Sequence, residues 1–340
     1  MTPKDLISLA VDLGIAKDPR GKQAMETHLA RRRQRFEELS QQAREDFDEA
    51  SLSNPFGDTR LVVDGNGMDV EAILIGIDIG QEEVLMGDRL RQKSGKSLMV
   101  ISHHASALGK AMASVWDTIN VQIHMLNEAG VPWCEAERVT RELEVVKETN
   151  RREADLTILK TAENLEIPLA SIHAPADLFA YALIRDMVNE RRPDKVEDFL
   201  NMAAEIREFQ ALYDIGWVPK LKLGEASKPF QPTYFSLIGG WNPVPGAIEL
   251  LARAGIRTLV MVECSMDLEE EARRHGINVV LLPHYPYDSL GLNLILNEIL
   301  SVSETAFEIH ACSNYLRVEE TNRGRQSPIL SSVNLHREKG

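Results

Sequence analysis

The chain has 340 residues, of which 44% are hydrophobic and 26% are charged, so it is long enough for a large domain or two lobes with a substantial core. Its formal net charge is −14, from 38 basic and 52 acidic residues. This charge argues against a nucleic-acid backbone or an anionic membrane as the main partner.

The cysteines and the apolar runs indicate the cellular compartment of the protein. Cys134, Cys264 and Cys312 are widely spaced and form no C-x-x-C pair, which is typical of a reducing compartment. No segment reaches the roughly 18 consecutive apolar residues of a membrane span, and the start does not have the pattern of a signal peptide. We therefore expect a cytoplasmic protein.

Residues 1–58 read as a helical extension. Apolar residues at helical spacing predict a first helix that ends near Gly14, and a polar helical stretch follows from about 21 to 50. Pro55 and Gly57 then break the pattern. The basic run at 30–35 is followed at once by acidic residues, which favours a solvated helix face. We interpret this extension as an arm for packing or oligomerisation.

From residue 59 to about 330, short apolar runs alternate with amphipathic helical patterns, which predicts an α/β fold with mostly parallel sheets flanked by helices. Helical patterns cover 81–93, 178–191, 194–213, 243–254 and 289–301, and a helical insertion covers about 106–165. The expected strands lie within 60–65, 72–80, 97–104, 167–175, 234–240, 257–263, 278–286 and 307–318.

Histidines stand at the ends of three expected strands. The first run, "VISHH", ends at His103 and His104; "SIHAPAD" carries His173 and Asp177, and "LLPHYPYD" carries His284 and Asp288. Ligand sites in α/β sheets gather outside the carboxyl ends of the strands. Parallel strands would therefore bring these three turns to one edge of the fold.

Imidazoles and carboxylates together are typical ligands of divalent transition metals, and carboxylates can bridge two cations. Each residue also has an ordinary structural interpretation. Asp177 and Asp288 precede expected helices and would stabilise a helix N-terminus, and His173 and His284 would be buried, hydrogen-bonded histidines. His103 and His104 are harder to explain in this way, because burying two imidazoles without partners is costly.

Taken together, these segments resemble the GTP cyclohydrolase 1 type 2 homologue family, also described as interacting-factor-3-like. The resemblance covers roughly 60–100 and 165–300, through "VDGNG", "AILIGIDIG", "ISHHASALG", "SIHAPAD" and "LLPHYPYDSLG". "GGWNPVPGAIELLARAGIRTLVMVECS" is similar to the stretch before the last motif. Asp288 stands where the family carries glutamate. Because aspartate is shorter by one methylene, we expect the second metal to be bound differently or more weakly.

The resemblance implies a two-lobed α/β fold with two divalent metal ions (Zn, Fe, Mn, Co or Ni) in the cleft between the lobes. The implied ligands are His103, His104, Asp177, His284 and Asp288, with either aspartate placed to bridge. His173 would lie beside the metals and transfer protons. The family's toroidal oligomers imply a homo-oligomer, with a hexamer expected.

The expected function is hydrolysis by a metal-activated water. The substrate would be a small molecule such as a nucleotide whose ring is opened, a phosphoester or another cyclic amide. The alternative is a metal-binding oligomeric protein without turnover, such as a metal carrier or a scaffold. Neither hypothesis requires a nucleic-acid or membrane partner.

Glycine-rich segments give weaker signals. "KSGKS" at 93–97 lacks the first glycine of a phosphate-binding loop, and "GNG" at 65–67 lacks the third glycine of a dinucleotide site. "GGWNPVPG" at 239–246 reads as a rigid turn into a helix, with a substrate-phosphate contact as the alternative.

Overall fold

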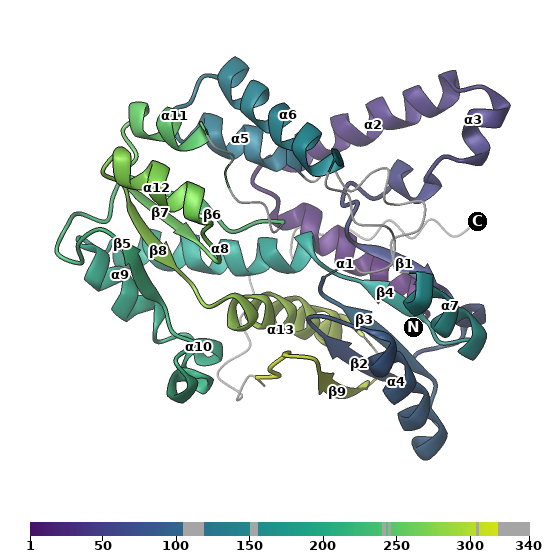
Figure 1. Ribbon diagram of the computed structural model, residues 1–340. Helices are drawn as coiled ribbons and strands as arrows, with labels where there is room; N and C mark the ends of the chain where they lie inside the picture. Colours follow the sequence, from purple (N-terminus) through teal and green to yellow (C-terminus); the bar gives the residue numbers. More distant parts are fainter. Residues whose placement is uncertain (105–118, 150–155, 240–242, 244–245, 304–305, 319–340) are drawn as a thin grey trace.

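In the part of the chain that the structure describes, a five-stranded and a four-stranded β-sheet lie on either side of a pair of long central helices (Figure 1). The computed structural model describes residues 1–340 except 105–118, 150–155, 240–242, 244–245, 304–305 and 319–340. None of the described helices is long and apolar enough to cross a membrane.

The first sheet has the strand order β1-β4-β3-β2-β9. Its strands are β1 Arg60–Val63, β2 Ala72–Gly76, β3 Leu98–Ser102, β4 Leu169–Ser171 and β9 Glu308–Cys312. Neighbouring strands are parallel except for β1, which pairs antiparallel with β4. Every residue of β2, β3 and β4 is buried, which explains why these segments are continuous apolar runs rather than alternating ones.

The second sheet has the strand order β5-β8-β7-β6. Its strands are β5 Lys220–Leu223, β6 Thr233–Ser236, β7 Thr258–Met261 and β8 Asn278–Leu281. Strands β6, β7 and β8 are parallel, and β5 pairs antiparallel with β8. Each sheet is therefore a parallel core with one antiparallel edge strand.

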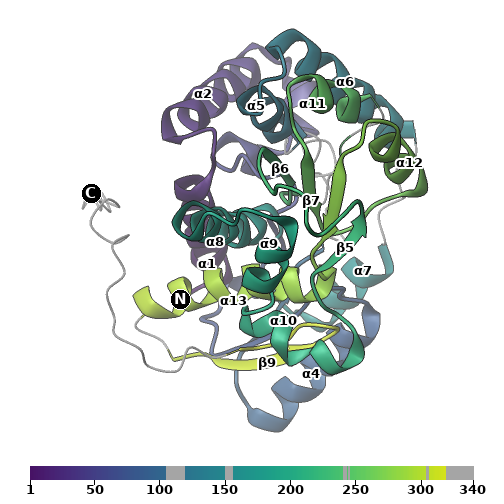
Figure 2. The same cartoon turned by 90° about the vertical axis from the view of Figure 1, so that its left-hand side faces the viewer.

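Helices cover both sheets (Figures 1 and 2). They are α1 Pro3–Lys17, α2 Lys22–Glu38, α3 Gln41–Glu45, α4 Gln81–Ser94, α5 Asn120–Glu128, α6 Trp133–Thr149, α7 Leu156–Leu165, α8 Ala174–Arg191, α9 Val196–Ala203, α10 Arg207–Ala211, α11 Ala247–Arg253, α12 Met266–Arg274 and α13 His284–Val302. Short 3-10 turns occupy Glu49–Leu52, Gly65–Gly67 and Tyr213–Ile215.

Helices α8 and α13 form the centre of the molecule, between the two sheets. They approach closely at Gly291 of α13, where a β-carbon would lie 2.4 Å from the carbonyl oxygen of Ala176 in α8. Only glycine permits this distance without a shift of one helix. The close approach brings the first turn of α8 beside the first two turns of α13.

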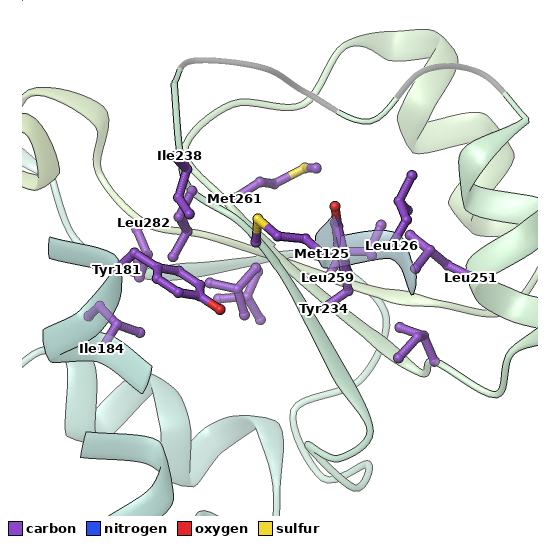
Figure 3. Packing of buried hydrophobic residues seen from close by; sticks show 14 of the residues in the cluster. Met125, Leu126, Tyr181, Ile184, Tyr234, Ile238, Leu251, Leu259, Met261 and Leu282 are labelled. Carbon is purple, nitrogen blue, oxygen red and sulfur yellow. The ribbon is translucent and has the colours of Figure 1, made fainter. Parts of the chain in front are cut away.

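Three hydrophobic clusters hold these layers together. Helices α1, α8 and α13 pack on one face of the first sheet, and α4 and α7 pack on the other. The largest cluster joins the second sheet to α8, α5, α6, α9, α11 and α12. Figure 3 shows part of it, with Tyr181 and Ile184 of α8 below Ile238 and Leu282, and Met125 beside Leu259.

The predicted fold class is confirmed: the protein is α/β, with mostly parallel sheets flanked by helices. Several boundaries were wrong. The first helix continues through Gly14 to Lys17, the stretch 21–50 breaks near residue 39, and 194–213 forms short helices rather than one. Strand β5 was not predicted, because its alternation of polar and apolar residues differs from the buried runs elsewhere.

Within the expected helical insertion, α5, α6 and α7 are present, and 105–118 and 150–155 lie outside the described residues. The glycine segments behave as turns where they are described: Gly95 ends α4 in a left-handed conformation, and 65–67 is a 3-10 turn. Most of "GGWNPVPG" lies outside the described residues.

Candidate metal centre

The structure brings the three histidine-bearing turns together. His103 and His104 directly follow β3, His173 lies between β4 and α8, and His284 begins α13 after β8. Asp177 and Asp288 each lie four residues after His173 and His284, Asp177 on the first turn of α8 and Asp288 just after the first turn of α13. The carboxyl ends of parallel strands in both sheets thus meet at the central helices, near the close approach of α8 and α13 at Gly291.

The distances within this cluster are longer than hydrogen bonds and suit ligands that share a cation. Nε2 of His103 lies 3.5 Å from Oδ1 of Asp177 and 3.6 Å from Oδ1 of Asp288. Nε2 atoms of His104 and His284 each lie 3.6 Å from Oδ2 of Asp288. Two ligands of one tetrahedral ion, with bonds of about 2.1 Å, lie about 3.4 Å apart.

Hydrogen bonds at Nδ1 orient three of the imidazoles. Nδ1 of His103 donates to the carbonyl oxygen of Ile172 at 3.1 Å. Nδ1 of His104 donates to Asp78 at 2.8 Å, and Nδ1 of His173 donates to Asp58 at 3.0 Å. Since these oxygens accept, Nδ1 carries the proton and Nε2 faces the cluster, which is the usual arrangement of metal-binding histidines.

Two buried atoms at the centre of the cluster lack hydrogen-bond partners among the described residues. They are Nε2 of His103 and Oδ2 of Asp288, on side chains with residue exposures of 0% and 2%. Buried polar atoms are normally paired, so each of these needs an explanation. A cation beside each of these atoms would satisfy it, and the donor set therefore fits a divalent metal.

Asp288 lies between two groups of possible ligands. One group is His103, Asp177 and Asp288, and the other is His104, His284 and Asp288; His173 also lies close to His103 and His104. Asp288 presents Oδ1 to the first group and Oδ2 to the second. Each carboxylate oxygen of Asp288 therefore faces a different group of possible metal ligands.

Charges within the cluster shift the pKa values of its members. Burial lowers the pKa of His103, but the charges of Asp288 and Asp177 outweigh burial and raise it to about 10. Burial likewise lowers the pKa of His173, and the negative charge of Asp177 with the hydrogen bond to Asp58 gives a net rise. Burial and the charges of the neighbouring histidines lower the pKa of His104.

Neither aspartate is an N-cap residue, although Asp177 lies in the first turn of α8, where a carboxylate stabilises a helix N-terminus. The N-cap residues of α8 and α13 are His173 and Pro283. Oδ2 of Asp177 accepts a 2.6 Å hydrogen bond from the backbone N–H of Gly239 in the loop after β6. The carboxylate of Asp177 thus contacts both the histidine cluster and the loop that follows β6 of the second sheet.

Sequence reasoning missed Asp58 and Asp78. Asp78 follows β2 at the same sheet edge as His103, so the strand-end rule that selected the histidines could have found it. Asp58 precedes β1, and it reaches the carboxyl end of β4 only because β1 is antiparallel. No pattern in the sequence reveals that strand direction.

An aromatic stack extends outward from His284. The ring of Tyr285 lies nearly parallel to that of His284, with centroids 6.0 Å apart, and stacks on Trp217 at 4.9 Å. The hydroxyl of Tyr285 faces the carboxylate of Asp78, which also holds His104, and the charge of Asp78 raises the pKa of this tyrosine. Trp217 precedes β5, the antiparallel edge strand of the second sheet.

Comparison with solved structures identifies the fold. A NIF3 superfamily protein from Sphaerobacter thermophilus superimposes with a TM-score of 0.65 over 76% of this chain and 91% of its own, at 22% sequence identity. The resemblance to interacting-factor-3-like proteins is thereby confirmed in the fold. No protein-family model and no curated protein matches the sequence.

Two other solved structures align over similar lengths with lower scores. Reduced HcgD from Methanocaldococcus jannaschii has a TM-score of 0.46 at 17% identity, over 76% of this chain and 89% of its own. A Bacillus cereus protein related to NIF3 has a TM-score of 0.41 at 12% identity, over 75% of this chain and 91% of its own.

Proposed function

We propose that the protein is a metal-dependent hydrolase with a dinuclear site at the junction of its two sheets. The observation that carries this proposal is the pair of unpartnered buried atoms, Nε2 of His103 and Oδ2 of Asp288, inside a set of imidazoles and carboxylates spaced as metal ligands. In an ordinary protein core, apolar packing and internal hydrogen bonds would leave no unpartnered polar atoms of this kind.

In this proposal His103 and Asp177 would hold one divalent ion, His104 and His284 would hold the other, and Asp288 would contribute to both. The chemistry available from two such ions is Lewis-acid polarisation of a substrate oxygen and activation of water at neutral pH. His173 lies beside the ligands, with Nε2 3.7 Å from Oδ2 of Asp177. It is the candidate to accept and return protons during hydrolysis.

The shared fold supports the rest of the proposal. We assign the chain to the GTP cyclohydrolase 1 type 2 homologue family, with residues 59–330 as the two-lobed metal-binding core and 1–58 as its N-terminal extension. The substrate class is a small molecule such as a nucleotide, a phosphoester or a cyclic amide. A cytoplasmic homo-oligomer, a hexamer by resemblance, completes the proposal.

The test combines metal analysis with an activity screen. The purified protein should bind about two divalent ions per chain. Zn, Mn, Fe and Co forms are then assayed with nucleotides, cyclic nucleotides and phosphoesters. Metal-dependent turnover should be lost in His104→Ala and retained in His275→Ala, a control at an exposed histidine that follows α12.

Asp288 replaces the glutamate of the family, and this difference favours a second candidate function. A carboxylate shorter by one methylene than the family's glutamate reaches less far between two ions, which favours binding over turnover. Metal bound at this stoichiometry without turnover of any substrate would overturn the hydrolase and support a metal carrier or scaffold. Absence of bound metal under all loading conditions would overturn both.

A further inference from the structure

The N-terminal segment, residues 1–59, lies directly against the turn that carries His173 and Asp177. Helix α1 packs along α8, and it approaches closely at Gly14. A β-carbon at Gly14 would lie 2.8 Å from Cβ of Pro175 and 3.0 Å from the ring of Phe56. Pro175 lies between His173 and Asp177, so α1 touches the turn itself.

The loop that ends this segment is held in place by its own hydrogen bonds. Asn54 accepts a hydrogen bond from the backbone N–H of Phe56 at 2.8 Å and donates to the carbonyl oxygen of Thr59 at 2.7 Å. The hydroxyl of Ser171 in β4 donates to the carbonyl oxygen of Asp58 at 2.8 Å. The loop is therefore fixed to the strand whose end carries His173.

Two consecutive residues of this loop hold His173. The hydroxyl oxygen of Thr59 accepts from the backbone N–H of His173 at 3.1 Å, and Oδ2 of Asp58 accepts from its Nδ1 at 3.0 Å. Asp58 is only 3% exposed, so water does not compete for this carboxylate. The ring is thereby turned with Nε2 toward Asp177.

We propose that Asp58 is a positioning residue for His173, and that the N-terminal segment is a working part of the metal centre rather than a separate arm. Asp58 keeps the hydrogen on Nδ1 and leaves Nε2 as the atom that faces the cluster. Buried carboxylates that hold a histidine in this way fix its tautomer and its orientation. This inference deepens the proposed function, because the role of His173 there rests on its orientation.

The decisive variant is Asp58→Asn. Asparagine has the shape of aspartate but offers both a donor and an acceptor, so it can pair with either tautomer of the ring. The matched control is Asp18→Asn. Asp18 is also a buried carboxylate of the N-terminal segment, paired with Arg20 at 2.7 Å, and it makes no described contact with His173.

The first readout is the Nδ1–H signal of His173 in proton–nitrogen NMR spectra of metal-free protein, assigned with His173→Gln. We expect a signal protected from solvent exchange in the wild type and in Asp18→Asn, and loss of that protection in Asp58→Asn. The second readout is Zn²⁺ affinity by calorimetry. Since His173 is not a proposed ligand and contacts the ligand set through Asp177, affinity should fall by less than the roughly 10- to 100-fold that loss of a ligand histidine's partner costs, and it should remain unchanged in Asp18→Asn.

An unchanged Nδ1–H signal in Asp58→Asn would overturn the proposal, as would an equal loss of affinity in both variants. If Asp58→Asn does not fold, the wild-type protein still tests the proposal. An Nδ1–H of His173 that exchanges freely with solvent in the wild type would contradict the positioning role of Asp58. The NMR measurement uses neither metal nor substrate. Failure of the proposed hydrolase would thus be seen separately from failure of this inference.

Discussion

The buried and the exposed sides of the candidate metal centre differ in what surrounds them. On the buried side, His103 is fully buried and His173 is held by the buried carboxylate of Asp58. On the exposed side, the side chains of His104 and His284 are 31% and 34% exposed. Asp288 belongs to both sides and is itself buried.

This difference indicates a division of roles. Ligands packed into a core are held in one geometry, which favours tight binding of an ion. Ligands at the surface leave room for water or a substrate on the ion that they hold. We therefore expect the buried side to determine metal affinity and structural integrity, and the exposed side to determine access.

The largest effect should come from Asp288→Ala, because the two oxygens of Asp288 face the two sides. We expect loss of both ions, a greater effect than the roughly 10- to 100-fold that removal of an outer partner costs. Elemental analysis of purified protein and Zn²⁺ calorimetry measure it. Asp267→Asn, on the exposed surface of α12, is the control. Retention of both ions in Asp288→Ala would contradict the bridging role.

Gly291→Ala tests whether helix spacing sets the geometry of the centre. The added β-carbon would lie 2.4 Å from a backbone oxygen of α8, so one helix must shift and carry Asp177 or Asp288 with it. We expect destabilisation of about 1–3 kcal/mol together with weaker metal binding. Denaturant unfolding and calorimetry report the two effects.

The matched control for Gly291→Ala is Gly87→Ala, at a second helical glycine that packs closely. Gly87 lies in α4, where a β-carbon would lie 3.0 Å from Cγ2 of Val100 on the sheet face opposite α8 and α13. This crowding should lower stability without weakening metal binding. Unchanged metal affinity in fully folded Gly291→Ala would show that the helix contact does not position the carboxylates.

His103→Ala and His104→Ala compare the two sides directly. Removal of His103 leaves the carboxylates of Asp177 and Asp288 buried without their nearest positive partner, which should cost metal-free protein about 3–5 kcal/mol. Removal of the partly exposed His104 should cost clearly less, because water can replace its contacts. Urea unfolding with a chelator present measures both. Equal losses would show that the two sides are not distinct.

Proton release should accompany metal binding. With its pKa raised to about 10, His103 is protonated at pH 7 in metal-free protein, whereas metal binding requires a neutral imidazole there. Affinity should therefore rise with pH. Calorimetry in buffers of different ionisation enthalpy counts the protons, and heats that do not depend on the buffer would contradict this prediction.

The same shift determines how the stability of the metal-free protein depends on pH. Because the folded pKa of His103 lies above its unfolded value near 6.5, its pairing with the carboxylates stabilises the fold fully below that pH. This contribution is lost as the pH rises through about 10.

The smallest effect should come from Tyr285→Phe on the exposed side. This change keeps the stack on Trp217 and removes only the hydroxyl that faces Asp78. One hydrogen bond of about 1 kcal/mol corresponds to a several-fold loss in affinity for the more exposed ion. Competition titration with a chelator resolves this change, and Tyr213→Phe, at an exposed tyrosine, is the control. A complete loss of metal would contradict this prediction, because it would make the hydroxyl of Tyr285 essential for metal binding.

The sequence was sufficient for the α/β class, for nearly every strand, and for the set of side chains that meet at the centre. Two local rules explain this. Strands buried on both faces appear as continuous apolar runs, and the carboxyl ends of parallel strands meet at one sheet edge. His103 and His173 stand at such ends of one sheet, so their proximity follows from strand direction. His284 follows β8 of the second sheet, and only the packing of both sheets on α8 and α13 brings it to them.

Only the tertiary structure decided how this centre is completed. The antiparallel edge strands β1 and β5 bring the loops that precede them to the same edge, and with them Asp58 and Trp217. Whether an edge strand runs parallel or antiparallel depends on pairing between residues far apart in the chain, such as Lys220 with Leu281 and Arg60 with Ser171. Side-chain spacing within a short segment carries no information about such pairing, whereas it does encode the local turns that present the histidines.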